Sequence, residues 1–256
     1  MIVSRRLAPA ALAILPTLAL IAGCGGESDS ESAEPSAPAT TQATSPHTTT
    51  RSTVDSAGKG PVPASLRSAE SAAEDLIDEA LAGGRAQVIA NANELAAVAS
   101  GSLRSALRGA GVAPAEVDDF QRRANAVKRL APAAPLIDVA LASNHAFELL
   151  PDFFGRFKVD VPVDVTRLDY LDFEAKLESK AGDAAKLGSA VRGLGGVWTR
   201  LRPVIVRAGG AKAAADYDAH LKAMAGLSNN ARAGATQQEA QHGLDLVDDI
   251  ERVFAP

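Results

Sequence analysis

The chain has 256 residues, a formal net charge of −5 and a single cysteine, Cys24. One cysteine excludes an intrachain disulfide and any site built from several thiolates. Nucleic acid is a poor partner for this composition, because the charges are mildly acidic overall and form no basic block.

Residues 1–23 have the layout of a secretory signal peptide. Arg5 and Arg6 form a short basic region, and an almost entirely apolar run follows as far as Ala22. A membrane-spanning helix is the rival interpretation, but it needs about 20 apolar residues. This run is shorter and contains Pro9 and Pro16, so the pattern favours export.

The signal ends in Ile21, Ala22, Gly23 and Cys24, which resemble the lipobox of bacterial lipoproteins. The resemblance covers residues 1 to about 25. It implies that Cys24 receives a diacylglycerol group, becomes the first mature residue and anchors the chain to the extracytoplasmic face of the cell membrane. Two acyl chains are enough for durable anchoring. Because Arg5 and Arg6 follow Ser4, both the Sec and the twin-arginine export routes stay open.

Residues 24–62 are rich in Ser, Thr, Pro, Ala and Glu and hold almost no large apolar side chain. Such a segment cannot bury enough surface to offset its ordering entropy. We therefore expect a disordered tether after the lipidated cysteine, with a composition that also suits O-glycosylation.

Residues 63–256 show helical periodicity almost throughout. Glycines or prolines end each apolar stripe in the first half, as expected at helix termini. In chain order, these stripes predict helices over about 66–80, 88–106, 114–127 and 136–150.

The second half continues the pattern. Asp164 and Asp183 are predicted to cap two helices, and Thr236 with Glu239 forms a capping box for the last helix. The helix after Asp183 carries an apolar stripe with alternating spacings of four and three, in which Trp198 should be buried. Its members are Leu187, Val191, Leu194, Trp198, Leu201 and Ile205. No segment alternates with period two, so the predicted fold is an all-α antiparallel bundle of six to eight helices.

His145 and Glu148 are the first candidates for chemistry. With Ser143 they resemble, over six residues, the Gly-x-His-x-x-Glu signature of imelysin-like envelope proteins, with serine in place of glycine. That resemblance implies a helical fold and a link to iron handling. Spacing of three on a helix suits either a metal site or a hydrogen-bonded pair, and the pair is the favoured interpretation.

The other histidines offer weaker signals. Glu239 and His242 form one Glu-x-x-His unit, whereas di-iron bundles need two. His220 and Met224 lie four apart and are interpreted as a surface histidine beside a core methionine. No nucleophile elbow is present, and Gly193, Gly195 and Gly196 are predicted to mark a helix kink or a close helix contact.

Six of the ten aromatic residues lie between positions 147 and 173. The favoured interpretation is that they fill the core where the helices are interrupted, and the alternative is an apolar ligand pocket. These ligand-binding candidates are Phe147, Phe153, Phe154, Phe157, Tyr170 and Phe173.

The sequence therefore supports a non-enzymatic, membrane-anchored extracytoplasmic lipoprotein that binds an unidentified envelope ligand or protein. No cofactor and no catalytic residue is predicted. The alternative is a helical lipoprotein that binds a metal such as iron or copper through His145 and Glu148, together with His220 or His242.

Overall fold

The computed structural model describes residues 60–228 and 233–255. The predicted signal, Cys24 and nearly all of the predicted tether lie outside the described residues. The described part is helical, and the one bridge of β type within it joins Pro61 to Lys158. The prediction of an all-α bundle is confirmed.

Helices follow one another with short connections along the described chain. Their bounds are α1 Ala64–Ala82, α2 Arg85–Ser100, α3 Ser102–Gly109, α4 Pro114–Leu130, α5 Leu136–Phe147, α6 Leu150–Phe154, α7 Val163–Ala181, α8 Ala184–Arg207, α9 Ala211–Ser228 and α10 Ala233–Val253. Eight of these are long, while α3 and α6 are short connecting helices.

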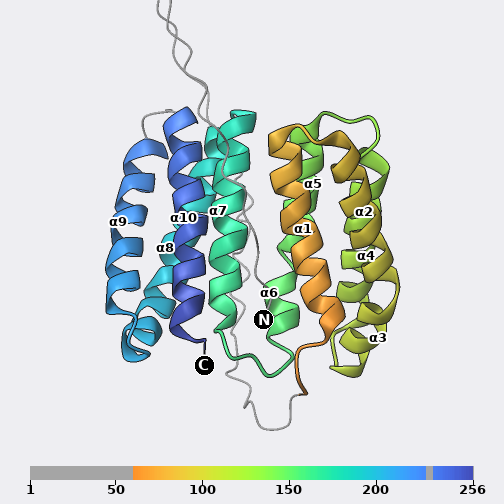
Figure 1. Ribbon diagram of the computed structural model, residues 1–256, viewed down its shortest axis with the longest axis horizontal. Helices are drawn as coiled ribbons and strands as arrows, with labels where there is room; N and C mark the ends of the chain where they lie inside the picture. The colour runs from red at the N-terminus through yellow and green to blue at the C-terminus, as the bar shows by residue number, and fades with distance from the viewer. Residues whose placement is uncertain (1–59, 229–232, 256) are drawn as a thin grey trace, which may run out of the picture. The chain divides into compact units, whose positions relative to one another are not determined.

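The eight long helices form two four-helix rings (Figure 1). In the first ring α1 packs on α2, α2 on α4, α4 on α5, and α5 closes the ring against α1. In the second ring α7, α8, α9 and α10 pack in the same cyclic order. Helices α5 and α6 also pack against α7, so the two rings meet along α7.

The largest apolar cluster fills the first ring and extends onto α7 and α10, and a second cluster lies within the second ring. Leu66, Leu76 and Phe120 belong to the cluster that fills the first ring. Trp198 and Ile250 belong to the main cluster of the second ring. Every long helix therefore has an apolar face to bury, which is the usual source of helix stability in bundles.

Helix α8 carries the predicted apolar stripe. Trp198 is only 5% exposed and Leu194 and Ile205 are buried, so the predicted burial of Trp198 is confirmed. A Cβ added at Gly193 would lie 3.0 Å from the side chain of Leu171 on α7. This glycine marks a close helix contact, one of the two roles predicted for the glycines in this helix.

Some helix ends lie where the sequence predicts them, and others do not. Asp183 caps α8, and its Oδ1 accepts hydrogen bonds from the backbone N–H of Ala185 at 3.1 Å and Lys186 at 3.0 Å. The capping role predicted for Asp164 is wrong, because α7 already begins at Val163. Asp164 instead lies in the first turn, where it pairs with Arg167 at 2.6 Å.

Two other boundaries also differ. The predicted helix over 88–106 is divided at Gly101, whose ψ of −127° is not helical. The predicted capping box is wrong because α10 begins at Ala233. Thr236 therefore lies inside the helix, where it is buried, and Glu239 does not cap the helix. Across residues 60–228 and 233–255, no helix has the length and apolar character needed to cross a membrane.

Candidate functional site

The six aromatic candidates lie in or against the core of the first ring. Phe153 meets Phe120 edge to face with ring centroids 5.6 Å apart, and Phe147 lies 6.3 Å from Phe173. All five phenylalanines among the candidates are buried, while Tyr170 is partly buried against the same cluster. These rings therefore close the core where α5, α6 and α7 meet.

His145 and Glu148 lie together at the surface of the first ring. His145 Nδ1 is 3.3 Å from Glu148 Oε2, and Arg123 Nη1 donates to the same carboxylate oxygen at 2.7 Å. The guanidinium also lies 3.2 Å from His145 Nδ1. A positive charge thus already occupies the space between the two side chains. Among the described residues, no three His, Cys, Asp or Glu side chains are grouped so that they could hold a metal ion.

His220 is the main departure from the sequence interpretation. It was expected at the surface, but its side chain is buried between α7, α9 and α10. His220 Nε2 is 3.0 Å from Asp172 Oδ1, and His220 Nδ1 is 2.9 Å from Glu239 Oε1. Tyr217 O–H donates to Asp172 Oδ2 at 2.8 Å. We call Asp172, Tyr217, His220 and Glu239 the His220 network.

The network is held by close packing against α10. A Cβ added at Gly243 would lie 2.5 Å from Asp172 Oδ1 and 2.6 Å from His220 Nε2. Any side chain at this position would therefore collide with the two buried polar groups. The ring of His242, which is exposed on α10, lies 6.4 Å from that of His220.

Electrostatics favour a doubly protonated ring at His220. Burial by itself lowers the pKa of His220, but the hydrogen bonds and negative charges of Asp172 and Glu239 together raise that pKa above its ordinary value. Burial raises the pKa of Asp172, although His220 and Tyr217 oppose the rise. A buried imidazolium that donates to two carboxylates satisfies both ring nitrogens.

Sequence reasoning missed this network although a signal was present. Tyr217, His220 and Met224 are spaced by three and four, which places His220 on the buried face of its helix. Leu168, Asp172 and Ala175 follow the same spacing on α7. Polar residues on the apolar stripes of two helices indicate a buried pair, since an isolated buried charge is too costly.

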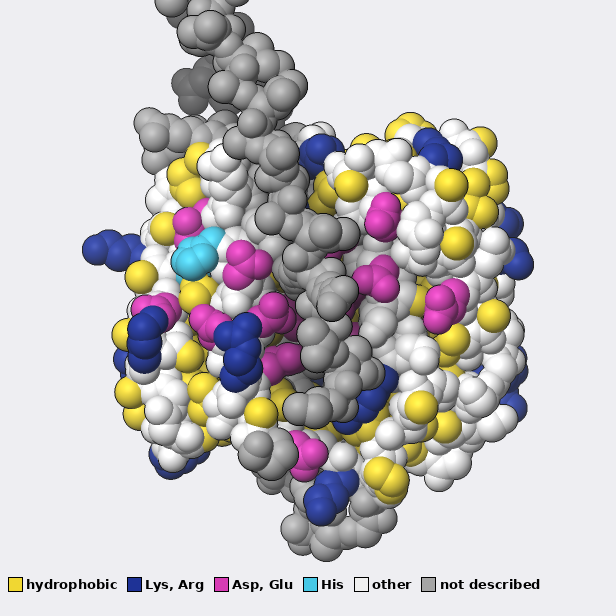
Figure 2. All heavy atoms as spheres, viewed as in Figure 1, with side chains coloured by type: hydrophobic (Ala, Val, Ile, Leu, Met, Phe, Trp, Pro, Cys, Tyr) yellow, Lys and Arg dark blue, Asp and Glu magenta, His cyan; other side chains and the backbone are white. Residues whose placement is uncertain are grey.

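A second charged feature is formed by acidic residues of α1, α7 and α10. It consists of Glu70 and Glu74 on α1, Asp169 on α7 and Glu251 on α10, and we call these four residues the acidic strip. Figure 2 shows acidic side chains over α7, α10 and the neighbouring part of the first ring. The four carboxylates lie close enough for charges within the strip to raise the pKa values of Glu70, Glu74 and Asp169.

Burial and like charge act together on the acidic strip. Partial burial is the main cause that raises the pKa of Glu70 to about 8; the charge of Glu251 adds to it, and Arg67 opposes it. The pKa values of Glu74 and Asp169 are raised well above the ordinary range, first by burial and then by the neighbouring carboxylates. Within the described part of the chain, the side chains of Glu70, Glu74 and Asp169 form no ion pair.

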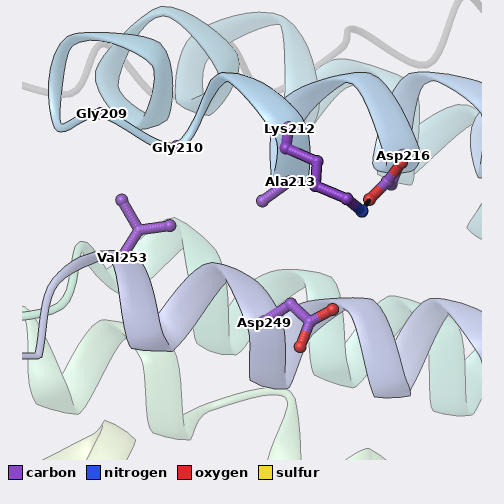
Figure 3. Close-up of a pocket in the computed structure, with 7 residues that line it drawn as sticks. All are labelled: Gly209, Gly210, Lys212, Ala213, Asp216, Asp249 and Val253. Carbon is purple, nitrogen blue, oxygen red and sulfur yellow. Dashed lines mark hydrogen bonds and ion pairs between the residues drawn. The ribbon is translucent and has the colours of Figure 1, made fainter.

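A shallow hollow of about 280 Å³ lies at the end of the second ring, between the turn at Gly209 and Gly210 and the last turns of α10 (Figure 3). Its charged residues are already engaged. Lys212 Nζ lies 2.5 Å from Asp216 Oδ2, and Asp249 pairs with Arg252. This hollow therefore lacks a charged group that is left without a partner to bind a ligand.

No protein-family model, no curated protein and no solved structure matches this chain.

Proposed function

We propose that this chain is a lipid-anchored extracytoplasmic protein whose helical domain binds a cationic partner through the acidic strip. The anchor rests on Ile21 to Cys24 at the end of an export signal. The observation that carries the binding role is the group of carboxyl groups on Glu70, Glu74 and Asp169, which form no ion pair among the described residues and come from helices of both rings.

Ionised carboxylates gathered in this way repel one another, and this repulsion adds to burial in favouring their protonated forms. A bound cationic group offsets the repulsion between the ionised carboxylates. Binding at the strip is therefore favourable. The buried aromatic residues offer no comparable surface, because their rings pack against one another in the core. The partner class that fits is a protein segment rich in lysine or arginine.

The first test concerns the anchor. In the native bacterium the mature chain should begin at Cys24 and carry diacylglycerol on the thiol, since the thiol is the acceptor of the lipid. Mass spectrometry of the mature N-terminus measures this directly. Cys24→Ser should give an unlipidated precursor or a secreted form, and a mature chain that starts downstream of Cys24 would contradict the proposal.

The second test concerns the acidic strip. The mature chain with Cys24→Ser should bind a lysine-rich decapeptide in titration calorimetry, and the affinity should fall as salt is added. Neutralising two carboxylates with Glu70→Gln and Glu74→Gln should weaken binding about two- to thirtyfold, because each surface charge pair contributes about 0.2–1 kcal/mol. A matched control changes charge equally elsewhere in the first ring, with Glu116→Gln on α4 and Asp138→Asn on α5.

The same titration should depend on pH in a defined direction. Glu70 is largely protonated at neutral pH because its pKa is about 8, and a cationic ligand favours the ionised form. Binding must therefore release protons, so the affinity should rise as the pH increases from about 6 to about 9. Equal affinity for the strip variant and the control, or affinity independent of pH, would remove the strip from the proposal and leave the anchor untouched.

A further inference from the structure

The His220 network connects three helices of the second ring through hydrogen bonds between its side chains. Asp172 comes from α7, His220 and Tyr217 from α9, and Glu239 from α10. Tyr217 also stacks on Trp198 of α8, with ring centroids 4.5 Å apart. The network therefore touches every helix of this ring.

Helix α9 depends on the network more than its neighbours do. Its buried residues are Ala214, Tyr217, His220 and Met224, so half of them belong to the network. Helix α8 buries seven residues, all of them apolar. A change in the charge of His220 should therefore act mainly on how α9 is held.

The two carboxylates that flank His220 differ in access to water. Asp172 is completely buried, whereas the side chain of Glu239 is 22% exposed. A neutral imidazole keeps only one N–H. That proton should remain on Nε2, because Asp172 has no water to replace the hydrogen bond, and the lone pair of Nδ1 would then face a carboxylate oxygen of Glu239.

We infer that the contact between His220 and Glu239 is a proton-dependent latch, closed while the ring carries both protons and open once Nδ1 loses its proton. In the open state Glu239 turns toward solvent and α9 is held less tightly against α10. This inference rests on the geometry of the second ring and is independent of the proposed binding function.

Other titratable groups around His220 do not provide the same switch. On α7, Asp172 is buried and keeps its hydrogen bond from Tyr217, and Asp169 lies one turn away. On α10, His242 is exposed and its ring lies 6.4 Å from that of His220. Helix α8 contributes the uncharged ring of Trp198 through its contact with Tyr217. Of the two carboxylates that the structure describes beside His220, Glu239 is thus the one that can turn to water.

The sign of the response follows from the pKa of His220, which lies above its ordinary value. A raised pKa means that the network's contribution to stability is fully present below about pH 6.5, the value for an unperturbed histidine. The contribution is lost as the pH rises through the folded-state pKa. The second ring should therefore loosen on the alkaline side.

The test uses the mature chain with Cys24→Ser, labelled with nitrogen-15. NMR titration should show the His220 ring titrating above pH 6.5, with the neutral form protonated on Nε2. Amide hydrogen exchange should show protection in α9 falling about tenfold relative to α4 between pH 6 and pH 9. His220→Gln should abolish that relative change, and the exposed control His242→Gln should keep it.

The outcomes separate cleanly. A His220 ring that titrates at or below pH 6.5, or that keeps its neutral proton on Nδ1, would overturn the inference from the wild-type spectra alone. These spectra remain decisive even if His220→Gln fails to fold. Relative protection of α9 that stays constant with pH, or that changes equally in His220→Gln, would also overturn it.

Discussion

Replacing Trp198 with alanine should lower the free energy of unfolding by about 3–5 kcal/mol, the usual range for removing a large aromatic side chain from a core. Trp198 is 5% exposed, stacks on Tyr217 and donates from Nε1 to Asp218 Oδ1 at 2.7 Å. A loss of this size approaches the whole stability of a marginal domain. Urea unfolding followed by circular dichroism measures it without relying on the tryptophan itself.

Trp198→Phe is the matched control for this experiment. It keeps an aromatic ring in the core and removes the hydrogen bond to Asp218, which remains paired with Arg202 at 2.8 Å. We expect a smaller loss of about 1–2 kcal/mol. Wild-type fluorescence should be blue-shifted and resist iodide. Strong quenching together with an alanine variant as stable as wild type would show that α8 does not pack as described.

Gly243→Ala should destabilise the domain by about 2–4 kcal/mol, against the general rule that alanine stabilises a helix relative to glycine. The reason is steric: the new Cβ would meet Asp172 Oδ1 at 2.5 Å and His220 Nε2 at 2.6 Å. Moving either group breaks a buried, charged hydrogen bond. Thermal unfolding and the NMR signals of the His220 ring report both effects.

Gly196→Ala, on another helix of the second ring, has the opposite expected effect. Gly196 lies inside α8, and a Cβ there would meet no atom within 4 Å. This substitution should therefore stabilise the domain by about 1 kcal/mol. If both alanines stabilise the protein to the same extent, the backbone of α10 does not approach the His220 network as closely as described.

Local chemistry made much of the helical layout predictable. Gly83 adopts a left-handed conformation with φ of 88° and ends α1, as the glycine pair at this position predicts. Pro114 begins α4, and Asp183 caps α8. Signals of this kind depend on residues near one another in sequence, so they can be interpreted without knowing the tertiary structure.

Other features depended on contacts between distant residues. Thr236 and Glu239 have the spacing of a capping box, but Glu239 binds His220 on α9 instead. The apolar pattern also runs through Gly101 without a visible break, although α2 ends there. A local pattern cannot show which of two possible partners a side chain meets, because that choice is made by packing.

The candidate sites also combine contacts that are local in sequence with contacts between distant residues. The spacing of His145 and Glu148 predicted that they would meet, and they do, but Arg123 comes from another helix and could not be foreseen. The acidic strip joins residues about 100 and 180 positions apart in sequence. Only the assembly of the two rings brings these carboxylates together.

The backbone bond from Lys158 N–H to Gly60 O, 2.8 Å long, gives the domain a defined point of mechanical attachment. Among the described residues, tension from the N-terminal side would reach this bond before α1, which begins four residues later. A partner bound at Glu70 and Glu74 would apply force to the same helix, α1. The His220 network lies in the second ring, so tension of this kind would act on α1 and leave the proton response of the second ring unchanged.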